Sequence, residues 1–481
     1  MRSEGDNHQG RKVNINEKLS AISFSTTTTT KLTPEKNPDV HIIVIDSVAS
    51  SQIIRALPQT VNFLLHGMNA VQFRKFNKIG SNSRPNALAL FFGKSTENVV
   101  RSPMNLPNLN ADLDFEQICE RYLDNETYIP IEYRDAGYKT LGAEDCWITI
   151  LDHPVCHGMK QKVVHHSYRT FRSRSTEDSE LKKIHYHGVC HSPKFSYSWL
   201  VEIAHDNTRN LYRADSDLYE FLVKNRMALN NSFIFLLGDH GPRLGKEAET
   251  AHGNREQNNP FLYVVVPEYL RKKQIYKQLR QNSEQLVTPH DLHSTLKDIL
   301  YFQPTSSFTD TSFMKYDSNP YGSSLLRKFE HGVRRTCKTL PIPFQHCICQ
   351  FKTDTVSDLN LTRTLGEFAA QRLAGRLEMR GVSSVCEDIA LGKVISVEKY
   401  QSCINKSTNT TTYSNYEVVF EVAPPANGRF QILVRIDRDR LQIDEEQPFI
   451  RLSVYGKNGQ CMKGDALRPL CTCRKNLDKN L

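Results

Sequence analysis

Two uninterrupted apolar runs are the main structural signal in this chain. The run from His41 to Ile45 ends at Asp46, and the run from Phe233 to Leu237 ends at the tetrapeptide Gly238-Asp239-His240-Gly241. Apolar runs without alternation are typical of strands that are covered on both faces, as in parallel sheets. The pattern therefore predicts an α/β fold with a mostly parallel central sheet flanked by helices.

Acidic residues follow these strands where each one ends. A third segment, Gly137 to Ala143, leads to Glu144 and Asp145 in the same way that the first run leads to Asp46. In open α/β sheets, ligands bind at the carboxyl ends of the strands, and an Asp beside a His offers two ligands suited to a divalent metal. The alternative is that these are solvated loop carboxylates, but three such strand ends together favour a metal or anion site.

Ser83 lies where a loop gives way to a predicted helix. The segment Gly80 to Asn86 is followed by an apolar stretch, with Pro85 suited to a first helical turn and Gly93 to the end of the helix. Free N–H groups and the positive end of the helix dipole stabilise an anion at such a position. Ser83 is therefore either a nucleophile or only part of the helix cap, like its neighbour Asn82.

The order of these motifs resembles the alkaline phosphatase and sulfatase superfamily. Within that superfamily the chain resembles the domain-of-unknown-function family number 229, whose members are secreted or membrane-anchored sulfatase-like proteins. The resemblance runs from about residue 38 to the last cysteines and implies an alkaline-phosphatase-like core. Its most specific segments are NSRPNALALFFG, GYKTLGAED, GDHGPR and TPHDLHSTLKDIL.

The resemblance implies a set of metal ligands. In the superfamily, the Asp of the first strand, the nucleophile and the Asp-His pair share one divalent metal; the matching residues here are Asp46, Ser83, Asp239 and His240. A second metal would use His252 and an Asp and a His from an intermediate segment, matched by Val201 to Asp206. His205 in that segment resembles the substrate-contacting His of sulfatases more closely. We therefore expect one or two ions of zinc, calcium or manganese, with His205 as a catalytic and substrate-binding residue.

The residues around Ser83 favour phosphoryl over sulfuryl transfer. Conversion to the formylglycine of sulfatases requires an Arg at the position held here by Ala87. An unmodified Ser suits a covalent phospho-serine, and guanidinium groups bind phosphate bidentately. Arg84 and Arg243 are thus candidate catalytic oxyanion contacts, or else surface ion pairs, and Asn82 and Asn86 are candidate substrate-binding residues.

Composition divides the chain of 481 residues into three parts. Residues 1–38 are polar and predicted to be a disordered tail, residues 39–335 form the alkaline-phosphatase-like catalytic domain, and residues 336–481 form a Cys-rich α+β domain. A polar insertion at about residues 152–191 holds seven histidines, and is predicted to be a lid, a metal-binding loop or simply a solvated loop. Its histidines are His153, His157, His165, His166, His185, His187 and His191.

The C-terminal part has its own strand and cysteine pattern. Val418 to Ala423 and Phe430 to Ile436 predict a hairpin around the turn Pro424 to Gly428, a helix is expected at about residues 360–380, and Phe449 to Tyr455 predicts a further strand. Eight of the chain's 12 cysteines lie here. Zinc sites prefer C-x2-C spacings, whereas the C-x-C pairs at 347/349 and 471/473 favour disulfides.

These features predict an extracellular or secretory-pathway protein. Five glycosylation acceptors agree with the disulfides, at Asn125, Asn230, Asn360, Asn405 and Asn409. Proteins of this kind usually begin with a signal or anchor segment; no signal peptide is visible here, so we expect that this sequence lacks its natural start. No apolar run approaches the ~18 residues needed to cross a bilayer.

The net charge and the candidate site residues limit the classes of function that this chain could have. The net charge of +9 is spread along the chain without the basic stripe of a nucleic-acid-binding protein. We expect a metal-dependent hydrolase or transferase acting on phosphate esters or phosphodiesters, with an anionic ester substrate such as a glycan or lipid head group. The alternatives are a sulfatase-like hydrolase of sulfate esters and a catalytically silent secreted binding protein that retains the fold.

Overall fold

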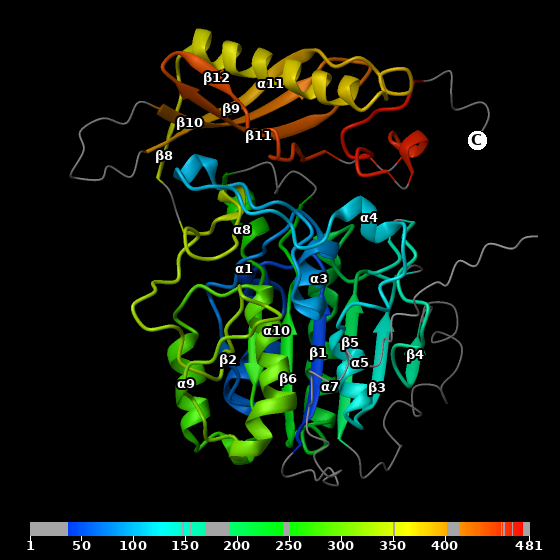
Figure 1. Ribbon diagram of the computed structural model, residues 1–481, viewed down its shortest axis with the longest axis vertical. Helices are drawn as coiled ribbons and strands as arrows, with labels where there is room; N and C mark the ends of the chain where they lie inside the picture. Colours follow the sequence, from blue (N-terminus) through cyan, green and yellow to red (C-terminus); the bar gives the residue numbers. More distant parts are fainter. Residues whose placement is uncertain are drawn as a thin grey trace, which may run out of the picture.

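A mostly parallel sheet forms the centre of the larger unit (Figure 1). The computed structural model describes residues 37–146, 149–153, 155–168, 193–243, 251–349, 352–401, 413–453, 455, 457–463 and 465–474. Within them, a seven-stranded sheet has the order β2-β7-β6-β1-β5-β3-β4, in which β7 runs antiparallel to both neighbours and the remaining pairs are parallel. The strands are β1 (Asp39–Ile45), β2 (Val71–Gln72), β3 (Lys139–Glu144), β4 (His166–Tyr168), β5 (Lys194–Leu200), β6 (Ser232–Leu237) and β7 (Leu262–Val265). The predicted α/β fold class is confirmed.

Helices cover both faces of this sheet because its central strands are apolar on both sides. Val40, Ile42 and Val44 of β1 pack on one face, in a core shared with α3 (Ser83–Phe92), α5 (Ile129–Asp135), α9 (Gln274–Asn282) and α10 (Pro289–Lys297). Ile45 packs on the other face with α1 (Ser50–Ala56), α2 (Pro58–Asn62) and α7 (Asp215–Lys224). Two more helices, α4 (Phe115–Cys119) and α8 (Ala251–Asn258), lie near the edge where the strands end.

The register of the strands brings their carboxyl ends to one edge. Val44 of β1 is paired with Leu237 of β6, and Ile45 with Leu200 of β5. Since these strands are parallel, the residues that follow each of them must leave the sheet side by side. Asp46 and Asp239 therefore lie on neighbouring strand ends, as the apolar runs predicted.

The C-terminal unit is a helix packed on an antiparallel sheet. Within the described residues, this sheet has the order β12-β11-β10-β9-β8, and β13 pairs with β11. The hairpin and the helix are confirmed, whereas the strand expected from Phe449 to Tyr455 is only the short β13. The elements are β8 (Thr353–Thr355), α11 (Leu359–Met379), β9 (Leu391–Tyr400), β10 (Tyr413–Val422), β11 (Arg429–Asp437), β12 (Arg440–Gln442) and β13 (Ile450–Arg451).

Disulfides hold the loops of this unit together. Six of the eight C-terminal cysteines pair among themselves, with Cα separations of 5.9 Å for Cys337–Cys347, 5.3 Å for Cys386–Cys471 and 5.8 Å for Cys461–Cys473. A fourth bond, Cys119–Cys156, lies in the larger unit. Disulfides of this number are typical of an oxidising compartment. Of the other cysteines, Cys190 and Cys403 lie outside the described residues.

The two units are joined above the carboxyl edge of the parallel sheet (Figure 1). A small apolar cluster contains Ala89 of α3, Leu286, Phe344 and Leu433 of β11. Polar contacts add to it: the side chain of Asn415 donates a 3.1 Å hydrogen bond to the carbonyl of Pro103. Among the residues that the structure describes, no helix has both the length and the apolar character that crossing a membrane requires.

Candidate active site

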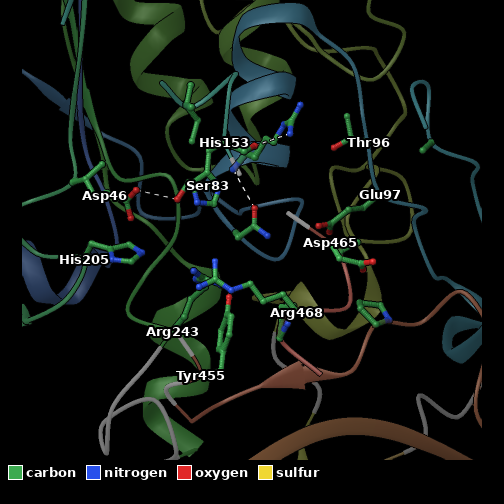
Figure 2. A pocket seen from close by; sticks show the side chains of 18 of the residues that line it. Asp46, Ser83, Thr96, Glu97, His153, His205, Arg243, Tyr455, Asp465 and Arg468 are labelled. Atoms are coloured by element: carbon green, nitrogen blue, oxygen red, sulfur yellow. Dashed lines mark hydrogen bonds between the residues drawn. The ribbon is translucent and has the colours of Figure 1, made fainter. Parts of the chain in front are cut away.

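Four of the predicted site residues meet at the carboxyl edge of the sheet. Ser83 Oγ donates a 2.9 Å hydrogen bond to Asp46 Oδ2 and lies 3.2 Å from His240 Nε2. His240 Nε2 is 3.4 Å from Asp239 Oδ2 and 3.9 Å from Asp46 Oδ1. Figure 2 shows Asp46 and Ser83 joined at one side of a pocket. Residues separated by nearly 200 positions therefore form one cluster.

The Asp46 carboxylate is oriented by neighbours on both sides. Its Oδ1 accepts a 2.8 Å hydrogen bond from the Ser47 hydroxyl, and its Oδ2 accepts one of 3.2 Å from Trp199 Nε1, in addition to that from Ser83. The indole belongs to β5, whose register places Trp199 opposite Val44. The strand neighbours thus fix the rotamer of the first acidic residue.

The His240 imidazole is buried and presents one nitrogen to the cluster. Its Nδ1 lies 2.8 Å from the carbonyl of Gly241, which fixes the proton on Nδ1 and leaves the lone pair of Nε2 facing Ser83. Burial, reinforced by the positive charge of Arg243, lowers the pKa of His240 to about 3. The ring is therefore neutral at physiological pH, as a metal ligand must be.

The donor set fits a divalent metal. The ligand atoms of Asp46, Asp239 and His240 all lie within 4.8 Å of one another, and all three residues are buried. Asp239 Oδ2 is buried and accepts no hydrogen bond from the described residues, and burial raises the pKa of this carboxyl. A buried carboxylate oxygen without a donor needs a cation nearby. Two carboxylates and a neutral imidazole are common zinc ligands.

Ser83 is the first residue of α3, and its two neighbouring asparagines shape the turn. Asn82 caps the helix by accepting a 3.2 Å hydrogen bond from the N–H of Arg84. Asn86 is buried, and its side chain binds the backbone of the loop. It accepts hydrogen bonds from the N–H groups of Ile79 and Gly80 and donates to the carbonyls of Gly80 and Asn82. Asn82 lines the pocket described next, whereas Asn86 braces the loop that holds Ser83.

A cavity of about 620 Å³ opens in front of Ser83. Its walls come from both units, so that the site lies at the junction between them (Figure 2). The larger unit contributes Asp46, Asn82, Ser83, Arg84, Glu97, His153, His205 and Arg243, and the C-terminal unit contributes Arg380, Glu446, Pro448, Tyr455, Asp465 and Arg468. This size is that of a site for a small molecule larger than a bare phosphate group.

The two predicted arginines are placed differently. Arg84 is 3% exposed, and its Nη1 donates to the carbonyl of His153 at 2.7 Å and to Sγ of both Cys119 and Cys156. Burial lowers the pKa of this guanidinium to about 10. Arg243 lines the same pocket and makes no hydrogen bond or ion pair with the described residues. Arg243 is therefore better placed than Arg84 to receive an anion.

The structure also places the predicted histidines. His205 lines the pocket, and its Nδ1 lies 2.7 Å from Asp206 Oδ1. His252 belongs to α8, but its side chain is outside the described part of the structure. Of the histidine-rich insertion, His153 lies in the pocket and His165 is bonded to Thr140, whereas His185, His187 and His191 lie outside the described residues.

Lys78 is a charged group near the site that sequence reasoning missed. Its Nζ is completely buried and has no hydrogen-bond partner among the described residues. Its N–H donates to the carbonyl of Asn258, and the N–H of Gly241 donates to the carbonyl of the preceding Gln257, so Lys78 lies beside the Gly238–Gly241 turn. Burial, followed by the charge of Arg243, lowers the pKa of Lys78 to about 7. A single Lys in a loop carries no sequence signal that could have indicated this.

Comparison with known proteins establishes the family. Residues 5–193 and 184–395 match a family described as protein of unknown function, DUF229. The match covers well over half of the chain, so the protein belongs to the DUF229 family, as its motifs indicated. No curated protein matches the chain.

Several solved structures are similar at a distance. Lipoteichoic acid synthase LtaP from Listeria monocytogenes is 11% identical, with a TM-score of 0.39 over 65% of this chain and 81% of that one. The C-terminal periplasmic domain of EcEptC from Escherichia coli is 11% identical, with a TM-score of 0.38 over 62% and 88%. Murine ectonucleotide pyrophosphatase/phosphodiesterase 5, in complex with AMP, is 12% identical, with a TM-score of 0.36 over 55% and 95%. At such distances, their ligands and substrates do not carry over to this chain.

Proposed function

We propose that this protein is a metal-dependent hydrolase or transferase of phosphate esters and that Ser83 is its nucleophile. The observation that carries the proposal is the position of Ser83 Oγ, 2.9 Å from Asp46 Oδ2 and 3.2 Å from His240 Nε2 at the amino end of α3. A helix cap alone would not need these two contacts. Asp46, Asp239 and His240 would hold the divalent ion, which would lower the pKa of the serine hydroxyl and neutralise charge on the transferred group.

The chain's own residues can perform the first half of the reaction. Ser83 Oγ forms a bond to phosphorus while the bond between phosphorus and the leaving oxygen breaks, and the hydroxyl proton passes to Asp46 Oδ2, which already accepts it in a hydrogen bond. The amino end of α3 stabilises the negative charge at Ser83. Arg243, which faces the pocket without a partner among the described residues, binds the non-bridging oxygens.

A second group is needed for the leaving oxygen. His205 lines the same pocket, and Asp206 holds its Nδ1, so that the opposite nitrogen is available to donate a proton to the departing alcohol. In the second half, water or an acceptor alcohol gives a proton to His205 and attacks the phospho-serine; the Ser83–phosphorus bond breaks, and the serine oxygen takes its proton back from Asp46. Hydrolysis and transfer differ only in that acceptor.

Two features favour phosphate over sulfate. Ala87, which stands where formylglycine conversion requires an Arg, is completely buried in α3 and packs in the core. Lys78, whose pKa burial lowers to about 7, is partly protonated at neutral pH and adds positive charge beside the Gly238–Gly241 turn. A phosphate monoester in its dianionic form gains more from extra cations than a sulfate monoester, which carries one negative charge.

The test is to trap the phospho-enzyme. Purified protein supplied with zinc, manganese or calcium is incubated with aryl phosphate monoesters, aryl phosphodiesters and aryl sulfates, and the acid-quenched protein is mapped by mass spectrometry. We expect phosphate on Ser83 and loss of turnover in Ser83→Ala, whose free energy of unfolding should fall by no more than the about 1.5–3 kcal/mol of the lost hydrogen bond to the Asp46 carboxylate, because Asn82 still caps α3. Turnover of Ser83→Ala at the wild-type rate would exclude the covalent mechanism. Release of sulfate alone would favour the sulfatase alternative, and absence of turnover and labelling with every ester and metal would favour a silent binding protein.

A further inference from the structure

The cavity in front of Ser83 has a second polar end. Figure 2 shows Asp46 and Ser83 on one side of the cavity and Thr96, Glu97 and Asp465 on the other. Thr96 and Glu97 follow α3 in the larger unit, whereas Asp465 belongs to the C-terminal unit. A volume of about 620 Å³ exceeds what a phosphoryl group fills, so this end is available to the remainder of a bound ester.

The Thr96 hydroxyl is a buried polar group at this end. Thr96 is only 4% exposed and lines the cavity, and its Oγ1 makes no hydrogen bond with the described residues. The large majority of buried polar atoms have a partner, because an unsatisfied one is costly. A hydroxyl can donate one hydrogen bond and accept others. Thr96 therefore indicates a ligand with a hydrogen-bonding group at this position.

Two carboxylates at the same end have one oxygen held by the chain and one oxygen open. Glu97 Oε2 accepts hydrogen bonds of 3.0 and 3.2 Å from the N–H and the hydroxyl of Ser81, and Asp465 Oδ1 accepts one of 2.7 Å from the N–H of Leu467. Glu97 Oε1 and Asp465 Oδ2 accept no hydrogen bond from the part of the chain that the structure describes. The bonds to the chain orient both carboxylates, and their open oxygens can accept from a ligand.

The charges of the cavity wall nearly balance. Apart from Asp46, which belongs to the metal cluster, the described residues of the wall carry five carboxylates and four guanidinium groups. This small excess of carboxylates disfavours a second anion on the ligand and leaves little net charge to attract a cation. A neutral hydroxyl suits such a mixed wall, because it can donate to a carboxylate and accept from a guanidinium group.

The C-terminal unit also gives the cavity an apolar surface. Tyr455, Pro448 and Pro469 line it. The buried guanidinium of Arg451 fixes two of them, since it lies 5.6 Å from the centroid of the Tyr455 ring and its Nη1 donates a 3.1 Å hydrogen bond to the carbonyl of Pro469. A sugar ring combines hydroxyls at its rim with apolar C–H faces, and a tyrosine ring offers such a face a large apolar surface.

We propose that the substrate is a phosphate ester of a polyhydroxylated ring, either a sugar or a cyclitol. Its hydroxyls donate to the open oxygens of Glu97 and Asp465 and pair with the Thr96 hydroxyl, while its apolar face packs against Tyr455. The position of the phosphate at Ser83 rests on the proposed function. The hydroxyl-binding end does not require catalysis, so binding alone can test it.

Matched esters test the recognition of hydroxyls. The full chain, supplied with metal, is assayed with the 6-phosphates of glucose, galactose and mannose beside (tetrahydropyran-2-yl)methyl phosphate, which has the same ring without hydroxyls. A second set compares myo-inositol 1-phosphate with cyclohexyl phosphate. We expect kcat/KM for at least one hydroxylated ester to exceed that for its parent by about tenfold to a hundredfold, the value of one hydrogen bond to a charged group. The set that shows the larger ratio identifies the ring as a sugar or a cyclitol.

Two results of this assay would contradict the proposal. Equal values of kcat/KM within both sets would mean that the hydroxyls are not recognised. A preference for 2-aminoethyl phosphate over ethyl phosphate that exceeds every hydroxyl preference would mean that the open carboxylates serve a cation.

Variants then assign the preference to this end of the cavity. Thr96→Val should lower the ratio of kcat/KM between the preferred ester and its parent by about threefold to tenfold without loss of stability, because the hydroxyl has no partner among the described residues. Asp465→Asn keeps an oxygen for the N–H of Leu467 and should lower the ratio by about tenfold. The control is Asp388→Asn, since Asp388 pairs with Arg474 at 2.6 Å in the same unit and does not line the cavity. Wild-type ratios in both folded variants would overturn the proposal.

A binding measurement separates this proposal from the proposed function. Ser83→Ala, supplied with metal, is titrated calorimetrically with each hydroxylated ester and with its parent, which needs no turnover. Tighter binding of a hydroxylated ester that weakens in Ser83→Ala/Thr96→Val supports the hydroxyl site even if the wild type hydrolyses no ester. Turnover by the wild type with no preference for hydroxyls in rate or in binding would support the proposed function and overturn the hydroxyl site.

Discussion

The backbone N–H of Ser47 donates a 3.0 Å hydrogen bond to Asp239 Oδ1, so the residue after the first acidic strand end holds the second one. Ser47 has a φ of 63°, a left-handed conformation that is uncommon for a residue other than glycine and that turns its N–H toward β6. The N–H of His240 donates to the same oxygen at 2.8 Å. One carboxylate oxygen of Asp239 is therefore fixed by the backbone, and the other faces Ser83 and His240.

The different roles of the two Asp239 oxygens predict the effect of Asp239→Asn. The amide can still accept from Ser47 and His240, but it removes the charge that the ion requires, so we expect a folded protein that has lost most of its bound metal. Metal content is measured by plasma mass spectrometry after dialysis. The control is Asp145→Asn. Asp145 also follows a strand of the sheet, β3, but its carboxylate accepts hydrogen bonds from the N–H groups of Val201 and Glu202 instead of joining the Asp239 cluster. A wild-type metal content in Asp239→Asn would exclude the site.

The turn that carries Asp239 and His240 has no room for a side chain at Gly238, which predicts that a substitution there destabilises the protein. A Cβ added at Gly238 would lie 2.3 Å from the carbonyl oxygen of Val48, a backbone atom that cannot move aside alone. Gly238→Ala should therefore reduce the free energy of unfolding by about 1–3 kcal/mol, as overpacking does, and weaken metal binding. In Gly375→Ala, by contrast, nothing lies within 4 Å of the added atom, which sits inside α11. That control should gain about 0.5–1 kcal/mol, and equal effects in denaturant titrations of the two variants would contradict this reading of the turn.

The proximity of Asp46, Asp239 and His240 could be predicted because it depends on strand ends. Two apolar runs without alternation require parallel neighbours, and parallel neighbours bring Asp46 and Asp239 to one edge. Likewise, Pro85 and Gly93 marked the ends of α3, where Gly93 has a φ of 68°. These signals are local in the sequence, so they can be recognised without knowledge of the tertiary structure.

The remainder of the pocket could not be predicted because it depends on packing between distant segments. Arg84 follows Ser83 directly, but the closure of Cys119 on Cys156 draws its guanidinium to that disulfide. Asn86 is drawn into the loop before Ser83 by four backbone groups. Arg468 and Tyr455 reach the site only because the C-terminal unit docks above the sheet, and no periodicity in the sequence encodes that docking.

Lys78→Met tests whether the buried lysine serves function or stability. Burial of a charge without a partner is costly, so we expect the apolar side chain to raise the free energy of unfolding by about 1 kcal/mol or more. If Lys78 helps to neutralise a bound phosphoryl group, kcat/KM should fall by about a hundredfold, the scale of one lost electrostatic contact. Lys75→Met is the control, since Lys75 Nζ binds the carbonyl of Glu284 at an exposed position. A loss of stability in Lys78→Met with unchanged activity would assign the lysine a purely structural role.

His293 predicts a pH dependence of stability that is separate from the active site. Its side chain is 1% exposed between α10 and α3, and its Nδ1 lies 3.1 Å from the carbonyl of Leu90. Burial lowers the pKa of this imidazole from 6.5 to about 3. Between these values the unfolded chain binds a proton that the folded chain does not, so the contribution of His293 to stability is complete above pH 6.5 and is lost as the pH falls.

The measurement compares wild type with His293→Gln in denaturant titrations at several pH values from neutral to about pH 4. Below the unfolded pKa, the free energy of unfolding of the wild type should fall with decreasing pH more steeply than that of His293→Gln. The difference in slope should be up to about 1.4 kcal/mol per pH unit. His331→Gln is the control, because His331 is exposed and its removal changes the histidine count equally. Other buried histidines, among them His290 and His346, also have lowered pKa values, so the variant should retain part of the acid sensitivity. Parallel curves for wild type and His293→Gln would mean that His293 titrates alike in the folded and unfolded chains, and would contradict the lowered pKa of this histidine.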